Sequence, residues 1–304
     1  MHVVEVPPPH AAAGQIRITV RASGVSPGEV RIRSGALRDR VSVVFPYRTG
    51  FDAAGVVDEV GDGVTGVSVG DAVFGMVDSS SRGANADVAV LVAWAPTPAG
   101  WSWAEAGGAA GSVETATRVL DRLAVAAGHT VLVQGASGAV GSVAVQFALA
   151  RGARVVGTAS EANHAFLRSL GAEPTTYGPG LPDRVRALAP AGVDAVFDCA
   201  GGALPDLVAV AGDPARVVTI ADLGAAAHGV HLSHAAPTTG AVSTDAAVGR
   251  GDRLAVSGLA DAVALAGSGR LRVPVAAAFA LTDVVAAHEL SENRHPPGKI
   301  VLVN

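Results

Sequence analysis

Hydrophobic positions follow a strand-like pattern in the first hundred residues of the chain. Short segments of alternating or continuous apolar residues are separated by Gly, Pro and Asp, which are typical of turns. We expect β-strands at 15–22, 53–60 and 71–74. The pattern predicts a compact, mostly antiparallel β domain.

After Trp101 the pattern changes to one in which helices and strands alternate. Residues 104–127 have helical spacing, with apolar positions recurring every three or four residues. We then expect strands at 130–134, 154–158, 175–177, 195–198 and 216–220, and helices at 139–150, 161–170 and 252–266. Such alternation is typical of βαβ units, in which a parallel sheet is covered by helices on both faces.

The regular pattern weakens after Val230 and resumes towards the end of the sequence. Residues 237–251 are rich in Thr, Gly and Ala and predict a loop. The last segment predicts a short helix at 282–290 and a strand at 300–303.

A glycine-rich turn between the strand at 130–134 and the helix at 139–150 carries the sharpest chemical signal. Gly135 permits a tight turn, Gly138 lets the backbone approach a pyrophosphate, and Gly141 lets the helix pack against the strand. Phosphates would lie at the helix N-terminus, where free N–H groups and the positive end of the dipole are found. The predicted cofactor contacts in the turn are Gly135, Ala136, Ser137, Gly138, Ala139, Val140 and Gly141. A purely structural glycine turn is the alternative.

The end of the next strand indicates which dinucleotide is bound. A site for NAD usually has Asp or Glu there to accept the ribose hydroxyl. This chain instead has Thr158 and Ser160, whose small hydroxyls suit a 2′-phosphate, and Glu161 follows where it favours a helix start. The sequence therefore favours NADPH over NADH.

Composition excludes several classes of protein. Hydrophobic residues make up 49% of the 304 residues and charged residues 16%, so the chain can bury a large core and is not disordered. A net charge of −5 without a basic stripe argues against nucleic-acid binding. We find no apolar run of membrane-spanning length and no signal peptide, and so expect a cytoplasmic protein. Cys199 is the single cysteine, which excludes a multi-cysteine zinc site.

Several motifs together resemble the zinc-free quinone oxidoreductase branch of the medium-chain dehydrogenase/reductase family. They are 21–27 (RASGVSP), 70–75 (GDAVFG), 135–141 (GASGAVG), 154–160 (RVVGTAS), 170–172 (LGA) and 298–302 (GKIVL). The resemblance implies an α/β fold: a Rossmann doubly wound parallel sheet, with a discontinuous GroES-like, mostly β domain. We therefore expect the GroES-like substrate domain at 1–104 and 270–304 and the Rossmann domain at 105–269. The family is usually homodimeric.

The same resemblance implies further cofactor contacts. Ser160, His164 and Tyr177 fall where the family places 2′-phosphate contacts, although His164 replaces a position that is often Lys. Thr115 matches a family Thr near the nicotinamide. The segment Ile220, Ala221 and Asp222 matches the one beneath the nicotinamide half, and Lys299 in the family's closing motif is counted with the cofactor contacts.

Two features of the sequence bear on whether the chain binds zinc. Zinc-dependent relatives have a Cys or equivalent ligand in the loop after the first strand, where this chain has 26–29 (SPGE). His228, His231 and His234 have a tempting spacing, but residues three apart on a strand face opposite sides. We favour surface or loop histidines over a metal site, and predict no metal.

The proton donor is the largest departure. Family members often carry a Tyr shortly after the loop that follows the first strand. In this chain the corresponding positions hold Arg31 and Leu37. We expect hydride transfer without an essential tyrosine acid, with Arg31 and Arg48 best suited to hold the developing oxyanion. The competing possibility is that Tyr47 is the donor. Tyr47 and Arg48 have an equally good interpretation as turn residues before Gly50.

Two reactive side chains have simpler interpretations. Cys199 ends a predicted central strand and is better explained as a small buried side chain than as a nucleophile. Glu114 lies beside Thr115 on a predicted helix and could reach the active site. A carboxylate that is solvated, or paired with Arg118 four residues on, is the safer interpretation.

The leading hypothesis is an NADPH-dependent reductase that transfers hydride to an activated C=C bond or a quinone. One alternative is a biosynthetic tailoring enzyme of the same family, with a divergent pocket and a bulky polyketide-like substrate. The other is a non-catalytic NADPH-binding sensor or partner protein, which the missing family tyrosine keeps open.

Overall fold

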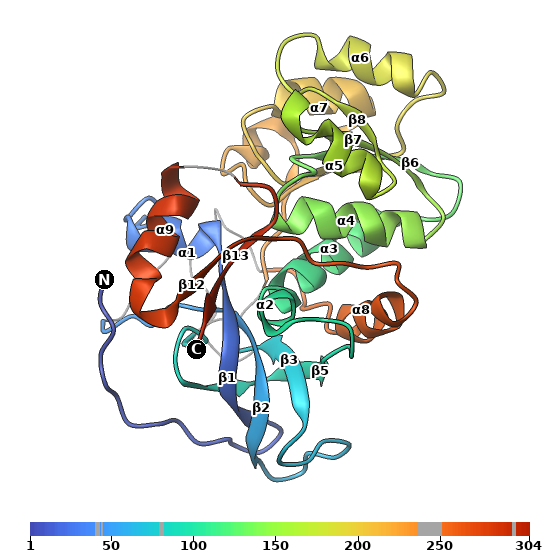
Figure 1. Ribbon diagram of the computed structural model, residues 1–304. Helices are drawn as coiled ribbons and strands as arrows, with labels where there is room; N and C mark the ends of the chain where they lie inside the picture. The colour runs from blue at the N-terminus through green and yellow to red at the C-terminus, as the bar shows by residue number, and fades with distance from the viewer. Residues whose placement is uncertain (40–42, 44, 79–81, 236–250, 294–295) are drawn as a thin grey trace. The chain divides into compact units, whose positions relative to one another are not determined.

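The computed structural model describes residues 1–39, 43, 45–78, 82–235, 251–293 and 296–304 (Figure 1). The described chain forms two compact units. The first consists of residues 1–114 and 256–304, and the second of residues 115–235 and 251–255.

The first unit is built on a mixed sheet that is mostly antiparallel. Its strands are β1 (Ile16–Val25), β2 (Asp52–Val60), β3 (Ala72–Met76), β4 (Val88–Leu91), β5 (Ala93–Pro96), β12 (Val275–Ala280) and β13 (Lys299–Val303). They follow the order β12-β13-β1-β2-β3-β5, with β4 also paired to β1, and β12 and β13 are parallel. The helices are α1 (Pro27–Arg33), α2 (Trp103–Gly107), the start of α3 (Ala110–Arg122), α8 (Ser257–Gly267), the 3-10 turn η4 (Leu281–Asp283) and α9 (Val284–Asn293). The predicted antiparallel β domain is confirmed.

Alternation along β1 gives this unit its main core. Ile16, Ile18 and Val20 are buried and pack with Val57 of β2 and Val73 of β3. A smaller cluster attaches two helices to the sheet, with Val30 of α1 and Val284 and Ala287 of α9 packed against Leu302 of β13. The sequence segments on either side of the second unit therefore share one sheet and one core.

The second unit contains a six-stranded parallel sheet. Its strands are β6 (Thr130–Gln134), β7 (Arg154–Thr158), β8 (Glu173–Thr175), β9 (Ala195–Asp198), β10 (Val217–Thr219) and β11 (His231–Leu232), in the order β11-β10-β9-β6-β7-β8. The α-helices are the rest of α3, α4 (Ala139–Ala150), α5 (His164–Ser169), α6 (Leu181–Leu188) and α7 (Leu204–Ala211). The 3-10 turns are η1 (Glu161–Asn163), η2 (Pro214–Arg216) and η3 (Ala225–His228). This is the predicted doubly wound sheet, and its strand order reverses between β6 and β9.

Four elements of the second unit, β6, α4, β7 and β9, have the bounds that the sequence predicts. The predicted helix 104–127 is instead two helices, because the chain turns at 108–109 after Gly107 meets β1. A Cβ on Gly107 would lie 2.5 Å from the Ala22 carbonyl carbon. Strand β8 lies two residues before its predicted position, and most of the predicted loop 237–251 lies outside the described residues.

The predicted domain boundaries after residues 104 and 269 stay a prediction. The compact units change over at 114/115, and α8, which we expected to complete the Rossmann domain, belongs to the first unit. The two helices of the second unit that periodicity missed, α6 and α7, begin with Leu-Pro-Asp. Pro in the first turn is a helix-start signal.

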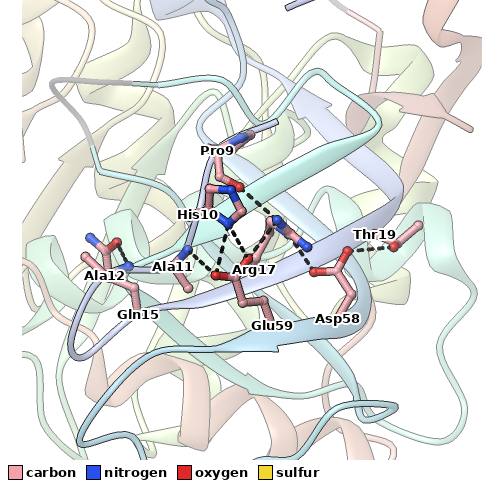
Figure 2. Close-up of polar contacts among 9 residues, drawn as sticks. All are labelled: Pro9, His10, Ala11, Ala12, Gln15, Arg17, Thr19, Asp58 and Glu59. Atoms are coloured by element: carbon pink, nitrogen blue, oxygen red, sulfur yellow. Dashed lines mark hydrogen bonds and ion pairs between the residues drawn. The ribbon is translucent and has the colours of Figure 1, made fainter. Parts of the chain in front are cut away.

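A network of charges fixes the segment before β1 (Figure 2). The Arg17 guanidinium donates to Asp58 (Nε–Oδ1 2.8 Å) and to the Pro9 carbonyl (3.1 Å), and lies 2.7 Å from a Glu59 oxygen. Glu59 also accepts from the Ala11 backbone N–H at 3.3 Å. This network attaches residues 9–11 to β1 and β2.

A buried ion pair connects the two ends of the first unit. Lys299 Nζ lies 3.3 and 3.2 Å from the two carboxylate oxygens of Asp52, and both residues are at most 5% exposed. The same carboxylate accepts the Gly111 N–H of α3 at 3.1 Å. Gly24 of β1 provides the space, since a Cβ there would lie 2.3 Å from Asp52 Oδ1. The pair therefore links β1, β2, β13 and α3.

We expect Lys299→Met to lower the free energy of unfolding by about 3–5 kcal/mol, because it leaves the Asp52 charge buried and unpaired. The double variant Asp52→Asn/Lys299→Met should recover most of that loss, since Asn Oδ1 can still accept the Gly111 N–H. Urea unfolding measures both values. A single variant within 1 kcal/mol of wild type would contradict the importance of the pair.

A second prediction concerns His288 of α9, which is fully buried and has neither ring nitrogen hydrogen-bonded within the described residues. Burial, aided by Arg33, lowers the pKa of His288 to about 4. The unfolded chain therefore binds a proton between about pH 6.5 and pH 4 that the folded chain does not, so acidification destabilises the fold by up to about 3 kcal/mol.

We expect His288→Leu to remove this contribution. The free energy of unfolding of the variant, relative to wild type, should rise as the pH falls from about 7 to about 4. Comparing the two proteins at each pH cancels the other groups that titrate in this range. A constant difference would show that His288 does not resist protonation.

Candidate functional site

The glycine-rich turn joins β6 to α4 and leaves little room for side chains. Gly135 has φ +73°, and a Cβ on Gly141 would lie 2.3 Å from the Gly135 carbonyl oxygen. The Ala136 N–H donates to the Thr158 carbonyl at 2.9 Å, which attaches the turn to β7. Gly138 is the N-cap of α4 and provides no capping side chain. The backbone N–H groups of this helix start suit a phosphate, so the turn fits a dinucleotide.

Thr158 at the end of β7 stabilises this turn through its side-chain hydroxyl. Its hydroxyl donates to Gln134 Oε1 at 2.6 Å and accepts the Gly135 N–H at 3.0 Å, and the residue is fully buried. The hydroxyl that we expected to face a 2′-phosphate is thus committed to the turn. Any effect of Thr158 on a cofactor acts through the position of Gly135.

The other predicted phosphate contacts follow β7 and β8. Ser160 precedes η1 and accepts from Asn163 Nδ2 at 3.3 Å, while His164 begins α5 and its Nε2 has no hydrogen-bond partner within the described residues. Tyr177 follows β8 and is 57% exposed. None of these three side chains is fully buried, so each can still meet a ligand.

Arg184 of α6 is a residue that the sequence reasoning missed. Its guanidinium donates to the carbonyls of 176, 177, 178 and 179 at 2.8–3.3 Å. It therefore fixes the loop that carries Tyr177. The signal in the sequence was the pair Gly178 and Gly180, which is typical of a tightly turned loop. In the structure both glycines have positive φ.

The segment Ile220–Asp222 is ordered by two buried groups at the strand ends. Thr219 Oγ1 donates to Asp198 at 2.7 Å and accepts the N–H groups of Ala221 and Asp222. The Asp222 carboxylate in turn accepts the N–H groups of Gly202 (3.0 Å) and Gly224 (2.8 Å). The segment is thus rigid, and Asp222 is hydrogen-bonded to its own loops.

Thr115 lies in a network around Arg118 of α3. Arg118 donates to Thr115 Oγ1 at 3.4 Å and to Ser233 Oγ, and it lies 3.8 Å from Asp252. Burial alone would raise the pKa of Asp252, but hydrogen bonds from Ser233 and His231 outweigh it and lower that pKa. Asp252 is therefore a carboxylate at neutral pH and holds these side chains in place.

The predicted catalytic side chains of the first unit lie on α1 and on the loop after it. Arg31 is in the last turn of α1 and is half-buried, while Arg48 is exposed and its side chain runs along Gly83. Tyr47 is half-buried, and burial raises the pKa of its phenol. Sequence reasoning passed over Glu29 of α1, which is 1% exposed.

Lys299, counted with the cofactor contacts, has its ammonium group in the ion pair with Asp52. Glu114 is fully buried, which excludes the solvated carboxylate, and its pairing with Arg118 stays a prediction. Cys199 follows β9, and burial together with Asp198 raises the pKa of its thiol well above the usual value. This favours the thiol over the thiolate that a nucleophile requires.

The three histidines lie in different surroundings. His228 is exposed at the end of η3, and His231 Nε2 lies 2.9 Å from Asp252. Burial lowers the pKa of His234. Within the ranges that the structure describes, no group of three or more His, Cys, Asp or Glu residues is placed to hold a metal ion. No described helix is long and apolar enough to cross a membrane.

Two family models match separate parts of the chain. The alcohol dehydrogenase GroES-like domain matches residues 12–127, and a model described as zinc-binding dehydrogenase matches residues 170–302. A solved alcohol dehydrogenase superfamily protein from Novosphingobium aromaticivorans superposes with a TM-score of 0.81 at 28% identity, covering 99% of this chain and 95% of that one. For the quinone oxidoreductase from Coxiella burnetii, the TM-score is 0.75 at 25% identity, with 99% and 94% covered.

Curated relatives include a quinone oxidoreductase and polyketide synthases. The quinone oxidoreductase of Mus musculus is 39% identical over 158 residues, which are 52% of this chain and 46% of that protein. The polyketide synthase GfsB of Streptomyces halstedii is 38% identical over 196 residues, 64% of this chain and 3% of the synthase. The chain thus spans less than half the length of these relatives. Motifs, fold and relatives agree: the chain is a quinone oxidoreductase-like member of the medium-chain dehydrogenase/reductase family.

Proposed function

We propose that this protein is an NADPH-dependent reductase that transfers hydride to an activated C=C bond or to a quinone, without a catalytic zinc. The observation that carries the proposal is the turn at the start of α4, followed by a β7 end that has Ser160 where an NAD site usually has an acid. When bound, NADPH supplies the hydride. The protein's own residues bind the cofactor, hold the negative charge that develops on the acceptor, and deliver the proton.

Each predicted site residue except Lys299, which pairs with Asp52, has a place in this proposal. Residues 135–141 bind the pyrophosphate, and Thr158 supports them. Ser160, His164 and Tyr177 bind the 2′-phosphate, with Arg184 fixing the loop of Tyr177. Thr115 and residues 220–222 serve the nicotinamide half. Arg31 and Arg48 are candidates for holding the oxyanion and Tyr47 for donating the proton.

The polyketide synthases among the relatives favour a second candidate function. In this alternative, the same hydride chemistry serves a bulky polyketide-like enone as a biosynthetic tailoring step. A cytoplasmic location and a homodimer stay predictions from the sequence and the family resemblance.

The proposed function is tested by following NADPH oxidation with a panel of quinones, simple enones and one bulky polyketide-like enone, with and without a zinc chelator. We expect turnover that the chelator leaves unchanged. Activity on the bulky enone alone would favour the tailoring enzyme. Tight NADPH binding without oxidation across the panel would favour a non-catalytic sensor, and loss of activity with chelator would contradict zinc independence.

Cofactor choice gives a separate prediction. NADPH should bind at least about tenfold more tightly than NADH, because a charge-assisted contact to the 2′-phosphate contributes ~1.5–3 kcal/mol. Ser160→Asp should reverse the preference, since the new carboxylate repels the phosphate and accepts the ribose hydroxyl. Fluorescence titration with both cofactors measures the ratio. Ser169→Asp, at the C-terminal end of α5, is the matched control, and equal affinities in wild type would contradict the assignment.

A further inference from the structure

A buried arginine of α3 bonds to two different elements of the second unit. Arg118 is 7% exposed, and its two terminal nitrogens have different partners. Nη2 donates to Thr115 Oγ1 at 3.4 Å, one turn earlier in the same helix, and Nη1 donates to Ser233 Oγ, directly after β11. Because the guanidinium is planar and rigid, it fixes the distance and direction between these two hydroxyl groups.

Ser233 extends this connection to the segment 220–222. Its backbone N–H donates to the Thr219 carbonyl at 2.8 Å, and Thr219 Oγ1 accepts two backbone N–H groups of that segment at 3.1 and 3.0 Å. A continuous series of hydrogen bonds thus runs from Thr115 through Arg118 to the segment 220–222. All of these residues belong to the second unit.

Asp252 holds the Arg118 guanidinium in this position. Its Oδ2 accepts the Ser233 hydroxyl at 2.5 Å and lies 3.8 Å from Arg118 Nη1. His231 Nε2 lies 2.9 Å from the same oxygen, and Arg122 Nη1 lies 3.5 Å from the other oxygen. The Ser233 hydroxyl therefore lies between a cation and a carboxylate, accepting from the first and donating to the second.

Attachment of α3 to its neighbours does not require a buried cation. Burial of a guanidinium carries a desolvation cost, and apolar residues of similar volume often replace a buried ion pair without loss of stability. An apolar side chain cannot, however, fix the orientation of a hydroxyl group. Thr115 is the one residue of 115–120 that is not buried, so its side chain is the one in this stretch that a ligand can meet. Arg118 thus suits a role in orienting an accessible side chain.

We propose that Arg118 is a positioning residue for hydride transfer, because it joins Thr115 to the segment 220–222 and so holds the nicotinamide half of the cofactor in one arrangement. The proposal rests on the proposed function, in which Thr115 and this segment serve that half. Hydride transfer needs reacting atoms held about 3–3.5 Å apart, so a nicotinamide that turns or shifts reacts more slowly. Ser233 and Asp252 act one step further away, by holding Arg118.

A binding experiment separates this role from a purely structural one. NADPH and 2′-phospho-ADP-ribose differ only in the nicotinamide ring. Arg118→Met and Thr115→Val should each weaken NADPH binding about fivefold, the net contribution of one hydrogen bond, and leave the affinity for 2′-phospho-ADP-ribose unchanged. The double variant should bind NADPH as well as either single variant, because both substitutions remove the same interaction. Isothermal titration calorimetry measures these affinities.

The fragment also reports on folding, since a variant that binds 2′-phospho-ADP-ribose like wild type has kept the rest of the site. The same comparison with NADH and ADP-ribose does not depend on the 2′-phosphate contacts. It should give the same fivefold loss for the dinucleotide alone.

Two further variants test the geometry of the guanidinium. Arg118→Lys keeps a positive charge beside Asp252, but a single Nζ cannot reproduce the planar pair of donors. It should lose the nicotinamide contribution as Arg118→Met does. Arg122→Met is the matched control, because it removes the other guanidinium beside Asp252, whose side chain is 46% exposed, and it should bind NADPH like wild type.

Turnover gives a second readout with any acceptor that the wild type reduces. Arg118→Met should lower kcat by about tenfold. The primary isotope effect with NADPH deuterated at the transferred position of C4 should increase, because hydride transfer becomes slower relative to binding and release. Arg122→Met should leave both values unchanged.

The outcomes separate the two claims. Arg118→Met that binds NADPH like wild type, or that weakens NADPH and the fragment equally, overturns the positioning role and leaves the proposed function in place. Arg118→Lys with wild-type NADPH affinity also overturns it, since charge without the planar donors would then suffice. A wild type that oxidises NADPH with none of the acceptors overturns the proposed function, while a fivefold loss confined to the dinucleotide still supports the placement of the nicotinamide by Arg118.

Discussion

The ion pair between Lys299 and Asp52 is the contact on which the first unit depends. Sequence segments 247 residues apart meet there, and the pair also holds the start of α3 through the Gly111 N–H. Two charges can be buried this deeply only when each satisfies the other and no side chain intervenes. Gly24 and Gly108 meet the second condition, because a Cβ on either would lie within 3 Å of Lys299 or Asp52 atoms. The return of the chain to its first sheet is thus fixed by electrostatics as well as by apolar packing.

The second unit connects neighbouring strand ends through buried hydroxyl groups instead of an ion pair. Here the positioning groups are neutral: Thr158 joins Gln134 and Gly135 at the ends of two adjacent strands, and Thr219 does the same for Asp198 and residues 221–222. Hydroxyl groups both donate and accept, so one side chain can order two backbone segments at the edge where a cofactor would bind. The rigid turn at α4 therefore depends on a residue one strand away.

The sequence predicted the second unit better than the first, and the reason is local. In residues 130–158 each strand and helix coincides with a continuous apolar segment, and glycines mark the turn between β6 and α4. The bounds of these elements could therefore be predicted without knowledge of tertiary packing. The split of 104–127 depended on Gly107 meeting β1, a contact between distant segments that periodicity does not contain. The bounds of α8 and its place in the first unit depended on tertiary contacts in the same way.

The residues of the candidate site likewise differ in how well the sequence predicts them. The glycine turn and Ser160 could be found because a motif of fixed spacing carries them. Thr158 was found as well, but its role was not, since a hydroxyl at a strand end can face solvent or a neighbouring strand. Sequence reasoning passed over Glu29, because its burial, and the lack of a hydrogen-bond partner for one of its oxygens within the described residues, are not apparent from the local sequence.

The scarcity of lysine has a practical consequence. Lys299 is the single lysine of the chain, and it is 5% exposed. Reagents that acylate the lysine amino group therefore find no exposed lysine side chain while the first unit is folded, and coupling or cross-linking through lysine will fail. Conversely, acylation of Lys299 requires the Asp52 pair to open and β13 to leave the sheet. The rate of that single modification is a chemical clock for local unfolding, and it needs no introduced label.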